Sequence, residues 1–212
     1  MEIEIWSDIM CPFCYLGKAR LEKALESFPG KADVAIRWRS FQLNPEMKSG
    51  QAMNVEDYLV ERKGWSREKI RANHDRIAKA GEAVGIEYHF EKAVVGNSFD
   101  AHRLLQLART QGRADALEDR LMRGYFAEGK DFDDIATLAA LGREAGLDPA
   151  AVDATLADKE AFAKEVRADV LESQRLGVTG VPFFVFDRKF AVSGAQEVET
   201  FAMALEKAAA TP

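Results

Sequence analysis

The chain has 212 residues, which is enough for one domain or for one domain that carries a large insertion. Hydrophobic residues make up 47% of it, so a core can form, and a disordered or collagen-like chain is excluded. Lys and Arg number 29 against 35 Asp and Glu, and the net charge of −6 argues against nucleic acid as a partner.

Two further features narrow the class of protein. No run of roughly 18 apolar residues predicts a membrane-spanning helix. The first six residues alternate charged and hydrophobic side chains, and they lack the basic start and apolar run of a secretory signal. We therefore expect a cytoplasmic protein with no membrane partner.

The start of the chain predicts a strand, a helix and a second strand. Residues 2–7 alternate as a strand does, and residues 12 to about 27 repeat their hydrophobic side chains with helical spacing. Pro12 suits the first helical position, where its missing N–H costs nothing. Hydrophobic residues alternate again over 33–41, which predicts the second strand, and Arg37 and Arg39 are expected on its polar face.

The middle of the chain, from about 55 to 176, predicts helices separated by turns. One helix is expected to start near Asn97 as its N-cap, and the last is expected over about 159–176. The others are predicted over about 66–84, around 117–125, from 134 to 146, and from 149 onward.

Strand patterns return at the end of the chain. Residues 183–186 form a dense apolar run, a turn follows, and residues 190–192 predict a short partner strand. A final helix is expected over about 196–209. The predicted fold class is therefore α/β, with the order β-α-β, a helical insertion, then β-β-α.

The two cysteines of the chain stand together in Cys11-Pro12-Phe13-Cys14. A disulfide between them would close a very short loop and would restrain the unfolded chain little, so we expect a chemical role. Half of a zinc site is the alternative, but the sequence has no second C-x-x-C and no H-x-x-x-H to complete it. We predict no metal and no organic cofactor.

The position of the pair at a helix start predicts thiol–disulfide exchange. Unpaired backbone N–H groups and the helix dipole favour a charged sulfur, so they should lower the pKa of Cys11. Cys14 lies one turn later and close enough to reach Cys11. We predict that Cys11 attacks the substrate and that Cys14 sits deeper and resolves the mixed disulfide.

Three segments resemble the DsbA-like family of thioredoxin-fold oxidoreductases. Residues 7–17 and 177–184 resemble the active-site segments of its FrnE-type branch, and residues 97–104 resemble a segment of the related 2-hydroxychromene-2-carboxylate isomerases. The resemblance implies a thioredoxin fold, with residues 1–50 and 175–212 as the thioredoxin-like domain and residues 51–174 as an inserted helical domain. It also implies a cis bond between Val181 and Pro182, whose backbone would bind an extended substrate.

Asp8 and His102, which lie in or near these segments, each have two interpretations. Asp8 either influences the thiol or caps a turn or the helix, and we favour the cap. The resemblance brings Asn97 and His102 toward the active site, although a structural role for His102 is equally consistent with the sequence. Phe13 replaces the histidine for which DsbA is known, so we expect a potential between roughly −270 mV for thioredoxin and roughly −120 mV for DsbA, and not at the DsbA end.

The sequence thus predicts a thiol–disulfide oxidoreductase whose partners are protein or small-molecule thiols and disulfides. In a reducing cytosol the direction of reduction or isomerisation is favoured, with glutathione as a candidate co-substrate. One alternative is a glutathione-dependent isomerase or kappa-class transferase, although those relatives typically carry serine where Cys11 stands. A non-catalytic binding module with the same fold is the other alternative.

Overall fold

The computed structural model describes residues 1–210 and is built around a four-stranded sheet. The strands lie in the order β2–β1–β5–β6: β1 (Glu2–Ser7), β2 (Ala35–Ser40), β5 (Phe183–Phe186) and β6 (Phe190–Ser193). β1 pairs with β2 in parallel and with β5 antiparallel, and β5 pairs with β6 antiparallel. The ends of the chain therefore share one sheet.

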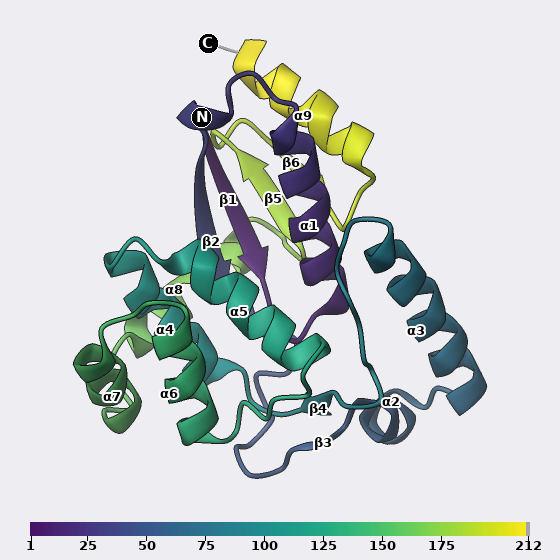
Figure 1. The fold of residues 1–212 in the computed structure, drawn as a ribbon, viewed down its shortest axis with the longest axis vertical. Coiled ribbons are helices and arrows are strands. Elements are labelled where there is room, and N and C mark those ends of the chain that lie inside the picture. The colour runs from purple at the N-terminus through teal and green to yellow at the C-terminus, as the bar shows by residue number, and fades with distance from the viewer. Residues whose placement is uncertain (211–212) are drawn as a thin grey trace.

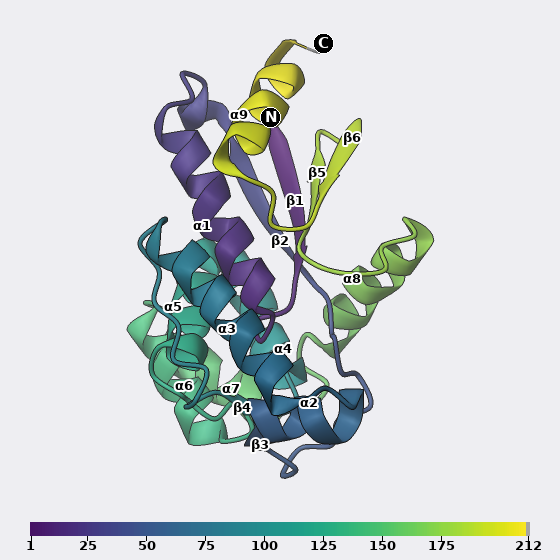
Figure 2. The same cartoon turned by 90° about the vertical axis from the view of Figure 1, so that its right-hand side faces the viewer.

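Helices cover both faces of this sheet. Figure 2 shows α1 (Pro12–Glu26) and α9 (Val198–Ala210) on one side of the strands and α8 (Ala163–Arg175) on the other. The indole Nε1 of Trp6 on β1 donates a 3.0 Å hydrogen bond to the backbone carbonyl of Asp169 on α8. This bond ties α8 to the central strand.

The segment between β2 and β5 is mostly helical and lies beyond one end of the sheet, where β1 leads into α1 (Figure 1). Two short strands, β3 (Met53–Asn54) and β4 (Val94–Val95), pair antiparallel within it. Its remaining helices are α2 (Val55–Lys63), α3 (Arg67–Glu82), α4 (Phe99–Thr110), α5 (Ala114–Phe126), α6 (Ile135–Glu144) and α7 (Pro149–Ala157).

Two hydrophobic cores result from this arrangement. One lies between the sheet and the helices α1 and α9, with Ile3, Phe184 and Phe201 fully buried. The other lies among α3 to α7 and includes both Cys11 and Cys14. The cysteine pair thus sits where the thioredoxin-like elements meet the inserted helices.

The predicted α/β order with a thioredoxin fold is confirmed, and most elements start and end within about two residues of their predicted bounds. The division of the chain at residues 50 and 175 stays a prediction. Among residues 1–210, no helix combines the length and the apolar character that crossing a bilayer requires.

Two local predictions were wrong, and one helix was not assigned bounds. α8 begins at Ala163 and not at 159, because Phe162 has a left-handed backbone (φ 60°) that a helix cannot contain. The N-cap of α4 is Ser98, while the Asn97 side chain accepts a hydrogen bond from the N–H of Phe99. α2 was not predicted, since Tyr58 is its one buried residue and its hydrophobic pattern is weak.

Candidate active site

The cysteine pair stands where β1 ends and α1 begins. Cys11 is the N-cap of α1 with an extended backbone, and Pro12 occupies the first helical position, as predicted. The N–H of Cys11 donates to the carbonyl of Asp8 (2.9 Å), and the N–H of Cys14 donates to the carbonyl of Cys11 (3.0 Å). A tight turn therefore presents the first sulfur at the helix N-terminus, with the second one turn behind it.

Both cysteines are free thiols and both are nearly inaccessible. Cys11 is 4% exposed and Cys14 is 1% exposed, so Cys14 lies the deeper of the two, as predicted. Burial raises the pKa of the Cys14 thiol well above its usual range, and contact with the Cys11 sulfur raises it further. Cys14 therefore holds its proton at neutral pH.

The loop before β5 faces Cys11. The Val181–Pro182 peptide bond is cis, as the resemblance implies, and the Cys11 thiol donates to the carbonyl oxygen of Val181 over 3.6 Å. Gly17 on α1 lies directly beside Pro182, and a Cβ atom on Gly17 would be 2.9 Å from Pro182 Cγ. The absence of a side chain at Gly17 lets this loop approach the helix.

A cluster of buried polar residues lies behind Cys14. The hydroxyl of Ser7 donates a 2.8 Å hydrogen bond to Oε1 of Glu118 on α5, and it also stabilises the charged form of the Cys14 sulfur. Glu118 is 1% exposed, and burial raises its pKa to about 7. A carboxyl group that titrates near neutral pH thus lies one hydroxyl away from Cys14.

Asp8 and His102 belong to the same buried region. The carboxylate of Asp8 accepts from the N–H of Met10 (3.3 Å) and from the N–H of Leu43 (2.7 Å), so Asp8 caps the turn, in line with the favoured reading. Nε2 of His102 lies 3.7 Å from Oδ1 of Asp8, and neither ring nitrogen has a hydrogen-bond partner among the described residues. His102 therefore lies near the active-site turn without contacting a sulfur through a hydrogen bond.

Asn97 has a different environment. Its side chain donates to the carbonyl of Met47 (2.6 Å) and accepts from the N–H of Phe99 (2.8 Å). It does not line the cavity beside Cys11. The structure therefore brings Asp8, Pro12, Phe13, His102, Val181 and Pro182 around the cysteine pair and leaves Asn97 in the loop before α4.

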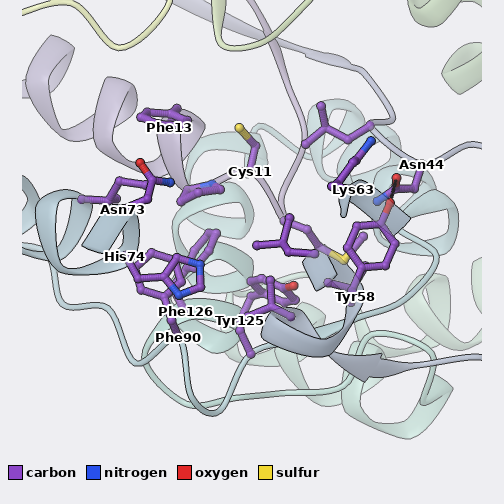
Figure 3. Close-up of a pocket in the computed structure, with 18 of the residues that line it drawn as sticks. Cys11, Phe13, Asn44, Tyr58, Lys63, Asn73, His74, Phe90, Tyr125 and Phe126 are labelled. Atoms are coloured by element: carbon purple, nitrogen blue, oxygen red, sulfur yellow. Dashed lines mark hydrogen bonds between the residues drawn. The ribbon is translucent and has the colours of Figure 1, made fainter. Parts of the chain in front are cut away.

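Cys11 opens onto a cavity of about 340 Å³ between the active-site turn and the inserted segment (Figure 3). Phe13 and Val181 line it beside the cysteine, and Tyr58 and Lys63 line it from α2. In Figure 3 the rings of Phe90, Phe126 and Tyr125 lie together on the side opposite Phe13. The reactive sulfur is therefore reached through an aromatic-lined cavity.

Residues 1–210 contain no group of three or more His, Cys, Asp or Glu side chains that is arranged to hold a metal ion. The chemistry that this arrangement supports is the exchange of a disulfide between two thiols and a substrate.

Comparison with known families decides the class of the protein. A model of the DSBA-like thioredoxin domain matches residues 2–206. The chain belongs to the DSBA-like thioredoxin family. A structure described as a probable DsbA oxidoreductase from Streptomyces coelicolor is 45% identical to this chain and has a TM-score of 0.96. The match covers 100% of this chain and 91% of that chain.

Two more distant structures share the fold of this family. The cytosolic disulfide reductase DsbM from Pseudomonas aeruginosa is 19% identical (TM-score 0.65, 98% of each chain covered), and it is also known with glutathione. A 2-hydroxychromene-2-carboxylate isomerase is 17% identical (TM-score 0.68, 98% of this chain and 95% of that chain). The family and its oxidoreductase members make the chain a disulfide oxidoreductase with thiol or disulfide substrates.

The sequence did not reveal the roles of Ser7 and Glu118. Ser7 was recognised only as the first residue of a family segment, and Glu118 lies within a helix that was predicted from Leu117 and Leu121. The sequence shows only that Glu118 directly follows the core residue Leu117, and this position is not specific to a functional glutamate. Their proximity depends on how α5 packs against the end of β1.

Proposed function

We propose that this protein is a cytosolic thiol–disulfide oxidoreductase of the FrnE type that mainly reduces or isomerises disulfides. The observation that carries the proposal is the placement of Cys11 at the N-terminus of α1, facing the carbonyl of Val181, with Cys14 buried behind it. Thiol–disulfide exchange needs one sulfur that attacks and a second that resolves. Cys11, which opens onto the cavity, is placed for the first role, and the deeper Cys14 is placed for the second.

The first step joins the substrate to Cys11. The Cys11 thiolate attacks one sulfur of the substrate disulfide, forms a mixed disulfide, and releases the other sulfur as a thiolate that takes up a proton. Val181 and Pro182 border the reacting sulfur, and the Val181 backbone is the element that binds an extended substrate. Phe13 borders the same space from the helix side.

The second step frees the substrate and requires that Cys14 lose its proton. Because burial keeps Cys14 protonated, a base must take this proton. The Ser7 hydroxyl takes it and passes its own proton to Glu118, and the Cys14 sulfur then attacks Cys11. A Cys11–Cys14 disulfide forms and the second substrate sulfur leaves as a thiolate, so two electrons have passed to the substrate.

A reductant must then restore the dithiol. Two molecules of glutathione, or of a comparable small thiol, reduce the Cys11–Cys14 disulfide and leave as a disulfide. The fold shared with the cytosolic reductase DsbM, which is also known with glutathione, supports this direction and this compartment. A reducing cytosol keeps the dithiol form dominant.

The proposal is tested by two variants and one assay. Purified protein should catalyse the reduction of insulin or of a small disulfide by glutathione, and Cys11→Ser should abolish this activity. Cys14→Ser should instead trap a mixed disulfide on Cys11, which mass spectrometry detects. Activity that survives in Cys11→Ser would overturn the proposal.

A glutathione-dependent isomerase remains the second candidate, because an apolar cavity adjoins Cys11 and the fold is shared with 2-hydroxychromene-2-carboxylate isomerase. The two candidates differ in what Cys11 must do. An isomerase of this kind typically carries serine at that position, so its activity should persist in Cys11→Ser. Glutathione-dependent isomerisation by that variant would favour the isomerase.

A further inference from the structure

The cavity beside Cys11 has a rigid, aromatic floor. The rings of His74 and Phe90 stack with centroids 4.0 Å apart, and Phe90 stacks on Tyr88 at 5.1 Å. Phe126 meets both Tyr88 and Phe90 edge to face. Interlocked rings of this kind hold a preformed apolar surface, against which another apolar group packs.

The cavity also controls access to the reactive sulfur. Cys11 is 4% exposed, and the carbonyl of Val181 lies 3.6 Å from its sulfur. The remaining approach leads through a space of about 340 Å³, near the lower end of the range for small-molecule sites. A small molecule fits completely into such a space, whereas a disulfide in a folded protein is surrounded by other residues that do not fit.

The charges that line the cavity are few. Among the described residues that line it, Lys63 alone has a permanent charge; this side chain is exposed and lies beside Asn44 (Figure 3). Burial lowers the pKa of His74, so this ring is neutral at pH 7. Glutathione carries two carboxylates and an ammonium group, which this lining does not match, so glutathione serves as a general reductant and is not the molecule that the cavity recognises.

We propose that the natural substrate is a low-molecular-weight thiol or disulfide with a flat apolar body, which packs on the floor formed by Phe90 and Phe126 beside Cys11. This inference rests on the proposed thiol–disulfide exchange and names its substrate class. A single acidic group at the outer end of the molecule would face Lys63.

Two matched substrates test the inference. Both are mixed disulfides of 2-mercaptoethanol, one with 2-phenylethanethiol and the other with ethanethiol, so the intrinsic reactivity of the sulfurs is similar. Each oxidises the reduced protein to the Cys11–Cys14 disulfide and yields two thiols, which acid quench and mass spectrometry follow. We expect the phenyl compound to react at least about tenfold faster, since even one methylene in an apolar pocket is worth roughly tenfold or more.

A variant that fills the cavity tests whether the preference for the phenyl compound arises there. Leu59 is a half-buried lining residue on α2, and Leu59→Trp should reduce the preference for the phenyl compound to about twofold or less. Leu171→Trp changes an exposed leucine on α8 outside the cavity and should leave the preference intact. If Leu59→Trp fails to fold, Val55→Phe, which also narrows the cavity, serves the same purpose.

The outcomes separate the inference from the function on which it rests. Equal rates for the two compounds, or a faster reaction with a disulfide-bonded peptide that lacks aromatic residues, would overturn the substrate class and leave the exchange reaction standing. A folded, reduced protein that reacts with neither compound and with no peptide disulfide would overturn both.

Discussion

The hydroxyl of Ser7 donates a 2.8 Å hydrogen bond to the carboxyl group of Glu118, and this bond joins the end of β1 to helix α5. Both side chains are buried, and the same hydroxyl lowers the pKa of the Cys14 thiol, against the larger effect of burial. A helix of the inserted segment therefore supplies an acid–base group to the cysteine pair of the thioredoxin-like part.

Glu118→Gln should slow the second step of the exchange and not the first. Without the carboxylate, the proton of Cys14 has no acceptor beyond Ser7, so the mixed disulfide on Cys11 should persist about 100-fold longer at pH 8. Quenched-flow mass spectrometry measures its decay from pH 5 to 9. In the wild-type protein the decay rate should rise through a transition near pH 7, the pKa of Glu118, and the variant should lack this transition.

The matched control for this experiment is Glu206→Gln, which changes an exposed glutamate on α9. It should keep the wild-type pH profile. An unaltered profile in Glu118→Gln would show that the proton leaves Cys14 by another route, and Ser7→Ala would then be expected to have no effect on the profile either.

The same residue makes stability depend on pH. Burial raises the pKa of Glu118 to about 7, above the value of about 4.3 in an unfolded chain, so the folded state binds more protons between these values. The free energy of unfolding should therefore fall by about 4 kcal/mol from this group as the pH rises from about 4.3 to 7, and it should level off above about pH 7. Urea unfolding at pH 5 and pH 8 should show a smaller fall in Glu118→Gln. An equal fall in both proteins would contradict the assignment.

Gly17→Ala should disturb the loop that carries Pro182. The new methyl group would lie 2.9 Å from Pro182 Cγ and 3.2 Å from Phe184 Cζ, and neither neighbour is a flexible chain end. We expect a loss of about 1–3 kcal/mol in the free energy of unfolding and a slower reaction at Cys11. Gly180→Ala is the control, because a Cβ atom there meets nothing within 4 Å, and its unfolding free energy should not decrease.

Asp169→Asn should strongly destabilise the fold. The Asp169 carboxylate accepts from Nη1 of Arg39 (2.7 Å), from Nε2 of Gln106 (2.7 Å) and from the N–H of Ser40 (3.2 Å), and it is 3% exposed. Removing one charge of a buried ion pair costs about 3–5 kcal/mol, which denaturant unfolding measures.

Asp153 offers a matched comparison for this change. It pairs with Arg143 at the surface, where both side chains are about half exposed. Asp153→Asn should therefore cost at most about 1 kcal/mol. Similar losses in the two variants would mean that the Asp169 network contributes no more than a surface pair.

Phe13→His should make the protein a stronger oxidant. A histidine between the cysteines adds a hydrogen-bond donor and positive charge beside Cys11, which stabilises the thiolate and thus the reduced state. Equilibration with glutathione should place the variant at a higher reduction potential than the wild type, while Phe13→Leu should change the potential little. A wild-type potential near the DsbA value of roughly −120 mV would contradict the role given to Phe13.

The elements of the sheet were predictable because their signals are local. Alternation over 2–7, the apolar run at 183–186, and Pro12 at the first position of α1 each follow from a few neighbouring residues. The cis bond before Pro182 was predictable only through the family resemblance, since nothing in the local sequence requires it.

Properties that depend on packing were not predictable. Arg39 was expected on a polar strand face, but it lies in a buried network with Glu4 and Asp169 because α8 covers that face of the sheet. The helical pattern of α5 likewise gives no sign that Glu118 faces Ser7. Asp169 lies 130 residues from Arg39 and Ser7 lies 111 residues from Glu118, so neither contact has a local sequence signal.

Tyr88 links the inserted segment to the cysteine pair once more, because its hydroxyl donates a 2.6 Å hydrogen bond to the carbonyl of Pro12. A minimal protein made by joining residues 1–50 to 175–212 would lose this donor. Such an excised core would keep its sheet residues but not the scaffold around its catalytic turn. The redox centre of this protein is therefore not transplantable with the thioredoxin-like strands and helices alone.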